Sequence, residues 1–242
     1  LEKKLIFAAF KCSKMANKKD QSEEVIVDVQ EVYSKTETFI NENKNTLSTV
    51  VAVIAVIIGG YFAYNSFYLA PMQDEAQEQM FMAEKYFAKD SMNLAIHGDA
   101  QHLGFLEIAD QYSGTKAGNL AYYYLGIAFL KTGQFEAAID ALEDFEGDET
   151  IVESIKYGAM GDAYMELGDY NKAVSNYEKA ATVVKNDFST PMYLLKAGQT
   201  YELLGDYDEA VDTYSKIKSD FRTSAEAADI EKYIARAESY VN

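Results

Sequence analysis

Three consecutive segments in the C-terminal half of the chain repeat one pattern of small, aromatic and turn-forming residues. Residues 126–129 (GIAF), 161–164 (GDAY) and 198–201 (GQTY) are each followed, seven residues after their first glycine, by a second Gly-x-aromatic run. The spacings between units are 35 and 37 residues. Repetition at such a period indicates supersecondary units that bury their apolar sides only by stacking on their neighbours. We therefore expect a stack of similar helical units.

The pattern resembles the tetratricopeptide repeat. In that family a small residue lets two helices approach, an aromatic residue fills the space between them, and a glycine ends the first helix before a short turn. The residue expected to fill this space lies four positions after the alanine of each unit; these residues are Leu142, Tyr177 and Tyr214. The resemblance implies an all-α fold: a right-handed α-solenoid with three repeats at residues 119–219, preceded by an atypical helix pair at 74–113 and closed by a capping helix at 224–242. A polar insert at 90–102 separates the helices of the atypical pair.

A second feature is a long stretch without charged residues, from residue 45 to residue 73. Its apolar part, residues 47–64 (LSTVVAVIAVIIGGYFAY), is long enough at about 1.5 Å per residue to cross most of a bilayer core of about 30 Å. A buried core helix is the alternative, but this run has no polar face to present to water. We predict a single N-terminal transmembrane helix at 46–70 that contacts the lipid bilayer, with Tyr61, Tyr64 and Tyr68 as interfacial anchors.

The residues before this span form an arm, for which we predict a cytosolic amphipathic helix at 15–45. Its apolar residues recur at helical steps: Val25, Val29, Val32, Thr36 and Phe39. Two interpretations stay open, namely a docking face for a membrane partner and a lead-in that lies on lipid headgroups. Residues 1–14 precede the first methionine, Met15, and we expect them to be a gene-model extension.

Charge and residue usage exclude several classes of protein. The formal charge of −17 belongs entirely to residues 74–242, because residues 1–45 hold eight lysines and eight acidic residues. Binding to nucleic acid needs clustered cations, so no nucleic acid is expected as a partner. The single cysteine, Cys12, has no partner for an internal disulfide.

Catalytic and metal sites are also not expected. No Gly-rich phosphate loop, paired catalytic carboxylates or Ser-His-Asp set can be assembled, so the chain is predicted not to be an enzyme and to need no cofactor. His97 and His102 lie near Asp99 but have no third ligand nearby, which favours exposed polar residues over a metal site. A regulatory or catalytic subunit with unrecognised chemistry is kept as a third class, to be tested by mutating both histidines.

The solenoid predicts where a partner binds, because the first helices of stacked repeats line a concave surface. Carrying the repeat period along the chain gives the candidate partner-binding residues: Tyr123, Ile127, Asp162, Met165, Met192, Lys196, Gln199 and Glu202. Methionines suit varied extended ligands, although Met165 and Met192 could equally pack against neighbouring helices. The Lys/Asn/Arg clamp with which related repeats hold the C-termini of chaperones is missing.

The order of arm, span and repeats resembles the YfgM-type ancillary subunits of the bacterial SecYEG translocon. The clearest local likeness is residues 39–45 (FINENKN), which run directly into the span. The resemblance implies a single-pass protein of the bacterial inner membrane with a cytosolic N-terminus and a periplasmic repeat domain. Its implied partners are SecYEG, a membrane-anchored periplasmic chaperone of the peptidyl-prolyl isomerase type, and emerging secretory polypeptides.

The sequence thus predicts a non-enzymatic, membrane-anchored tetratricopeptide adaptor of the Sec translocon that assists periplasmic chaperoning of secreted or membrane proteins. The alternative is a scaffold of another cell-envelope machine, in outer-membrane assembly or specialised secretion.

Overall fold

The computed structural model describes residues 29–148 and 150–241, and the chain divides into two compact units, residues 1–59 and 60–242. The predicted gene-model extension at 1–14, and the part of the predicted arm up to residue 28, lie outside the described residues. Every regular element in the described residues is helical, which confirms the prediction of an all-α fold.

The first described element is a long helix whose side chains are largely open to solvent at residues 37–64. Helix α2 (Val29–Tyr64) is followed by one π-helical turn, η2 (Asn65–Leu69), and by α3 (Ala70–Ala88). The helical segment Glu37–Ala88 is long and apolar enough to cross a membrane, and its most apolar window has no buried residue. The apolar side chains of residues 37–64 are therefore not covered by the part of the chain that the structure describes.

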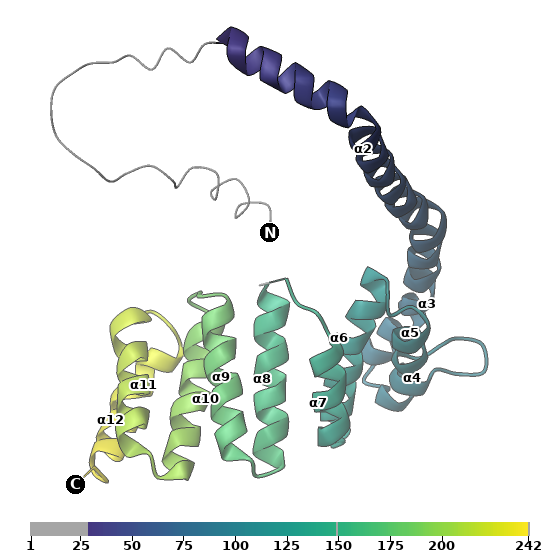
Figure 1. Ribbon diagram of the computed structural model, residues 1–242. Coiled ribbons are helices and arrows are strands. Elements are labelled where there is room, and N and C mark those ends of the chain that lie inside the picture. Colours follow the sequence, from purple (N-terminus) through teal and green to yellow (C-terminus); the bar gives the residue numbers. More distant parts are fainter. Residues whose placement is uncertain (1–28, 149, 242) are drawn as a thin grey trace, which may run out of the picture. The chain divides into compact units, whose positions relative to one another are not determined.

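The remaining helices stack as antiparallel pairs (Figure 1). They are α4 (Met92–His97), α5 (Phe105–Gln111), α6 (Lys116–Lys131), α7 (Phe135–Asp144), α8 (Ile151–Glu166), α9 (Tyr170–Val183), α10 (Ser189–Leu204), α11 (Tyr207–Asp220), the 3₁₀ turn η3 (Glu226–Asp229) and α12 (Ile230–Glu238). We call α6, α8 and α10 the first helices, and α7, α9 and α11 the second helices. The apolar core forms successive clusters along this stack, as expected where each unit contacts mainly its neighbours.

The same turn ends each first helix. Gly133, Gly168 and Gly205 have φ values of 75°, 76° and 82°, in the left-handed region that glycine adopts without strain. In each turn the residue after the glycine donates its backbone N–H to a carbonyl five residues earlier, at 2.9 Å; the three donors are Gln134, Asp169 and Asp206. This is the Schellman geometry, which satisfies carbonyls at the helix end. The glycines of the repeat are therefore the residues that turn the chain back.

The other glycine of each unit sets the distance between paired helices. A Cβ on Gly198 would lie 2.3 Å from Cε1 of Tyr214, and one on Gly161 would lie 2.6 Å from Cε1 of Tyr177. In the first unit, a Cβ on Gly126 would lie 2.4 Å from Cγ of Leu142. These residues pair as the sequence predicted, and any larger residue than glycine would push the second helix away.

The first helices and α3 all run in the same direction. Near their N-termini, Gln73 of α3 accepts a hydrogen bond from the backbone N–H of Ala117 in α6 at 3.2 Å. Just beyond the end of α3, Asp90 pairs with Lys131, the last residue of α6, at 3.2 Å. Likewise, the contacts between α8 and α10 advance in the same chain direction on both helices, from Asp162–Lys196 to Met165–Thr200. The N-termini of these helices therefore share one edge of the solenoid, which we call the amino edge; it comprises residues 113–116, 145–148, 150–151, 184–189 and 219–223.

The two ends of the solenoid differ from the regular repeats. The insert at 90–102, expected to be a polar segment, contains α4, which buries Met92, Ala95 and Ile96 against the first cluster. The helix was not predicted because its three apolar residues, although at helical spacing, lie among polar residues. At the C-terminal end, α12 buries Ile230 and Ala237 and packs on α11, with the Tyr214 and Tyr233 rings 5.5 Å apart.

Candidate functional site

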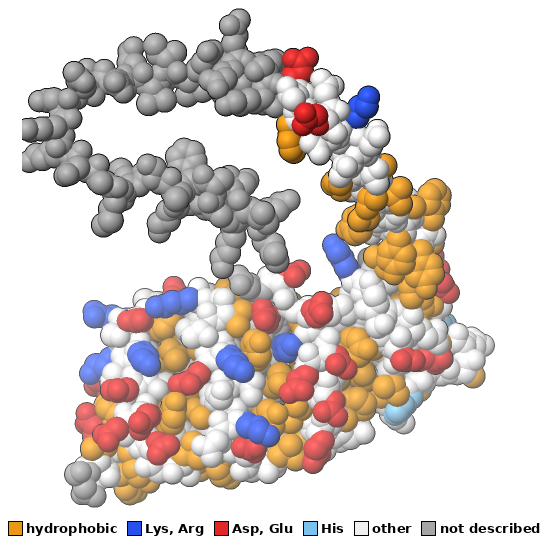
Figure 2. Space-filling view, in the orientation of Figure 1, with side chains coloured by type: hydrophobic (Ala, Val, Ile, Leu, Met, Phe, Trp, Pro, Cys, Tyr) orange, Lys and Arg blue, Asp and Glu red, His pale blue; other side chains and the backbone are white. Residues whose placement is uncertain are grey.

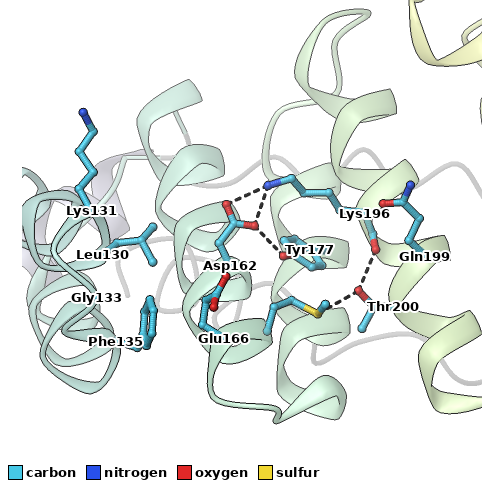
Figure 3. Close-up of a pocket in the computed structure, with 11 residues that line it drawn as sticks. Leu130, Lys131, Gly133, Phe135, Asp162, Glu166, Tyr177, Lys196, Gln199 and Thr200 are labelled. Atoms are coloured by element: carbon cyan, nitrogen blue, oxygen red, sulfur yellow. Dashed lines mark hydrogen bonds and ion pairs between the residues drawn. The ribbon is translucent and has the colours of Figure 1, made fainter.

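The main candidate site is a cavity of about 610 Å³ between the first helices of three successive units (Figure 3). Its walls come from the end of α6, the following turn and the first residue of α7, from α8, from Tyr177 of α9, and from α10. The lining residues are Leu130, Lys131, Gly133, Phe135, Asp162, Met165, Glu166, Tyr177, Lys196, Gln199 and Thr200. It is an open groove: Leu130, Phe135 and the Lys131 side chain lie on the α6–α7 side, and most of the polar lining residues come from α8 and α10 (Figure 3).

The centre of the groove holds an ion pair that joins two units. Lys196 of α10 donates to both carboxylate oxygens of Asp162 in α8, at 2.6 and 2.8 Å. The Tyr177 hydroxyl donates to Asp162 Oδ1 at 2.6 Å, and the Lys196 ammonium lies 5.5 Å from the centre of the Tyr177 ring. Burial and then the hydrogen bond to Asp162 raise the pKa of Tyr177 far above its ordinary value. The Tyr177 hydroxyl, the Asp162 carboxylate and the Lys196 ammonium group are therefore paired with one another.

The same arrangement recurs one unit later. Tyr214 donates to Glu202 Oε1 at 3.0 Å, and Arg236 of α12 pairs with the Glu202 carboxylate at 2.8 and 3.0 Å. In both sets the tyrosine comes from a second helix, the acid from its own first helix, and the cation from the next helix that follows in the stack. We call these two sets the inter-unit latches. They couple neighbouring units through charge-assisted hydrogen bonds.

Two groups beside the first latch bear on binding. Thr200 donates to the backbone carbonyl of Lys196 at 2.8 Å and lies 3.5 Å from the sulfur of Met165, so its hydroxyl is occupied. Gln199 is exposed, and its side-chain amide makes no hydrogen bond within the described residues. Its amide can both donate and accept, which suits it to the backbone of an extended peptide.

The eight predicted binding residues fall in two groups. Asp162, Met165, Lys196 and Gln199 line the groove. The other four lie outside its lining: Tyr123, whose ring is 5.5 Å from that of Phe145, Ile127 and Met192, which pack against buried clusters, and Glu202, which belongs to the second latch. Lys196 is already paired with Asp162, so a ligand carboxylate would have to compete for it.

Several lining residues were not predicted. Lys131 and Phe135 flank the turn glycine Gly133, and Tyr177 projects from a second helix. Periodicity of the first helices carries no information about these positions. The spacing of Tyr177 from Ala173 marked it as a packing residue, but only the structure shows that its hydroxyl reaches the groove.

The two histidines lie apart from the groove: His97 is the last residue of α4, and His102 belongs to a hydrogen-bond network in the loop that follows. His102 Nδ1 contacts the Asp99 carboxylate at 3.0 Å, and Asp99 also accepts from the backbone N–H of Gln101 and from the hydroxyl of Tyr86. These hydrogen bonds, that of Tyr86 first, hold the pKa of Asp99 well below its usual range. Residues 29–148 and 150–241 contain no group of three or more His, Cys, Asp or Glu that could hold a metal ion. The hydrogen bonds to the Asp99 carboxylate therefore hold this loop together.

Comparisons with known proteins agree with the repeat geometry. Residues 120–146 and 152–217 each match a family described as "Tetratricopeptide repeat". Two solved structures of nearly identical repeats from a Podosopora anserina putative kinesin light chain, one of them a point variant, align with TM-scores of 0.52. The alignments cover 69% of this chain and 87% of theirs, at 16% and 15% identity. No curated protein matches.

At this level of identity the likeness shows the fold, and the matched family is one that mediates interactions between proteins. The region from α6 to α11 is therefore a tetratricopeptide-repeat solenoid, the fold of a protein-binding scaffold.

Proposed function

We propose that this chain is a membrane-anchored adaptor that holds an extended polypeptide segment in the groove between its first helices. The observation that carries the proposal is the groove itself, whose lining includes both the apolar side chains of Leu130, Phe135 and Met165 and the unpaired amide of Gln199. An extended peptide has both apolar side chains and backbone groups to satisfy, and this lining offers partners for both. Catalysis plays no part in this function.

The proposal extends to the membrane and the translocon. The apolar helix would anchor the chain as a single-pass protein of the bacterial inner membrane, with residues 15–45 cytosolic and the solenoid periplasmic. There it would work beside SecYEG and a peptidyl-prolyl isomerase-type chaperone on emerging secretory polypeptides. Support comes from the likeness of residues 39–45 and the span to the YfgM-type subunits. A tether raises the effective concentration of the groove near an exit site.

Site-specific photo-crosslinking tests the groove. A photoreactive amino acid replaces Gln199, and in the matched control it replaces Ser215, an exposed residue of a second helix. During secretion of a reporter protein by cells, we expect light-dependent adducts with the reporter from position 199 and not from position 215. Equal adducts from both positions, or none from 199, would refute the groove as the binding site.

Two further measurements test location and partner. If the solenoid is periplasmic, protease added to spheroplasts degrades it, whereas protection would place it in the cytosol. Detergent extracts crosslinked through this chain should contain SecY. Extracts that contain the reporter but no SecY would favour a scaffold of another envelope machine.

A further inference from the structure

One buried tyrosine next to the groove has a hydroxyl without a partner. Tyr193, in the second turn of α10, is only 4% exposed and packs in the cluster that joins α9 to α10. A Cβ on Gly158 of α8 would lie 2.2 Å from Tyr193 Cε1 and 2.6 Å from its hydroxyl oxygen. The phenol ring therefore reaches from α10 across to α8, and the missing side chain of Gly158 leaves room for the hydroxyl.

The Tyr193 hydroxyl makes no hydrogen bond within the described residues, whereas those of Tyr177, Tyr201 and Tyr214 each donate to a carboxylate. In the part of the chain that the structure describes, no fully buried side-chain nitrogen or oxygen lacks a hydrogen-bond partner. The Tyr193 oxygen must therefore touch solvent, although almost all of its side chain is covered. A hydroxyl held at the surface by a buried ring binds a ligand without losing rotamer entropy, which favours its use as a fixed donor.

This hydroxyl lies beside the first inter-unit latch. Gly158 precedes Asp162 by one turn on the same face of α8, and Tyr193 precedes Lys196 by almost one turn of α10. Gln199, whose amide is also unpaired, follows Tyr193 by six residues, or about 9 Å of helix. About three residues of an extended chain span this distance. A single extended segment can therefore reach both groups.

Charges around the hydroxyl disfavour a ligand carboxylate. Burial and then the charge of Asp162 raise the pKa of Tyr193 to about 12, so the hydroxyl keeps its proton at neutral pH and can donate a hydrogen bond. The two cations of the groove lining, Lys131 and Lys196, are each paired with an aspartate. On the face of the solenoid that Figure 2 shows, acidic and basic side chains lie interspersed. A ligand carboxylate at Tyr193 would thus meet the Asp162 charge with both lining cations already paired, whereas a backbone carbonyl, which has no net charge, would not be repelled.

We propose that Tyr193 donates a hydrogen bond to a backbone carbonyl of the bound polypeptide, so that the groove takes internal segments of a chain in preference to its C-terminal carboxylate. The amide of Gln199 would bond the same backbone about three residues further along. This inference rests on the groove proposed above and deepens it, since it assigns a binding role to a residue outside the cavity lining. Tyr193 then has two roles: its ring packs in the core, and its hydroxyl holds the ligand.

Unfolding measurements test whether the hydroxyl is free. Y193F removes only this hydroxyl, and Y177F, the matched control, removes one that bonds Asp162 within the protein. In urea unfolding of the full chain in detergent, Y193F should keep the midpoint of the parent protein, because it loses no intramolecular hydrogen bond, whereas Y177F should lower it. A midpoint of Y193F lowered as far as that of Y177F would show that the hydroxyl has a partner within the protein and would overturn the proposal.

Photo-crosslinking during secretion tests the contact with the ligand. The photoreactive amino acid stays at position 199, and either Y193F or Y240F is added; Tyr240 is exposed and lies outside the groove lining. We expect about fivefold fewer reporter adducts with Y193F, the effect of losing one neutral hydrogen bond, and no change with Y240F. Mass spectrometry should locate the adducts in the interior of the reporter chain.

The outcomes separate this role of Tyr193 from the proposed function. Adducts at position 199 whose yield does not fall with Y193F would overturn the role of Tyr193 and leave the groove as the binding site. Adducts confined to the last residues of the reporter would overturn the preference for internal segments. Absence of adducts in the parent protein would refute the groove itself, and the role of Tyr193 with it.

Discussion

The latch in the groove permits a quantitative prediction of the coupling between units. Asp162 and Lys196 lie on successive first helices, and their two short hydrogen bonds join α8 to α10. With charge centres about 4 Å apart and an effective dielectric constant of about 20, their attraction would be about 4 kcal/mol. However, 38% of the Asp162 side chain and 35% of the Lys196 side chain are open to water. Solvent screening and partial desolvation reduce the net coupling to about 1 kcal/mol, above an exposed pair and below a buried one.

The assay is a double-mutant cycle with D162N, K196M and the double variant. Urea unfolding of the full chain in detergent is followed by the near-ultraviolet circular dichroism of tyrosine, which reports mainly the solenoid because 15 of the 19 tyrosines lie in residues 70–242. The expected coupling free energy is about 1 kcal/mol at low salt and smaller at high salt, because the pair is partly exposed.

The chain offers a matched control for this cycle. Lys131 and Asp90 also join two helical units, at 3.2 Å, but their side chains are 48% and 81% exposed. D90N and K131M should therefore give a coupling of at most about 0.5 kcal/mol. The reasoning fails if the Asp162–Lys196 coupling is no larger than this control or does not change with salt.

Two other predictions concern packing and pH. G198A should lower the free energy of unfolding by about 1–2 kcal/mol, because the clash with Tyr214 outweighs the better helix propensity of alanine. The control Q199A, on the exposed side of the same helix, should change it by less than about 0.5 kcal/mol. Urea unfolding of the two variants distinguishes these outcomes. Burial raises the pKa of Tyr193 from 10.0 to about 12, so its proton stabilises the fold below pH 10 and this stability is lost as the pH rises towards 12. An absorbance titration of tyrosinate in which all tyrosines ionise near pH 10 while helicity is intact would contradict it.

The repeat architecture could be predicted from sequence because it depends on local chemistry. Two glycines recur at the same positions in every unit. One must adopt a positive φ, as Gly168 does, and the other must leave room for the side chain of the second helix, as Gly161 does for the Tyr177 ring. The helix in the insert could not be found in this way. Met92, Ala95 and Ile96 are too few apolar residues to signal a helix, and their burial depends on tertiary packing against α3 and α6, which a local pattern does not show.

The groove could be predicted only in part, and the reasons are geometric. The repeat period identifies which face of a first helix is exposed, and this placed Asp162, Met165 and Gln199 in the lining. It does not reveal which side chains neutralise one another. Glu202 shares that face, but Arg236, which pairs with it, comes from α12 beyond the last repeat.

The latches also change what the acidity of the chain means for binding. The net charge of −17 belongs to residues 74–242, yet Asp162 and Glu202, two acids on the first helices, are each neutralised by a cation from the next layer. Long-range attraction of basic segments therefore originates from the other acidic residues of the solenoid, and acts on the approach of a ligand. The lining of the groove combines apolar side chains, Leu130, Phe135 and Met165, with the amide of Gln199 and the carboxylate of Glu166. Glu166 is exposed and makes no ion pair within the described residues. A basic side chain of a ligand would compete with Lys196 if it approached Asp162 but could pair with Glu166, so the groove suits an extended segment that carries both apolar and basic residues.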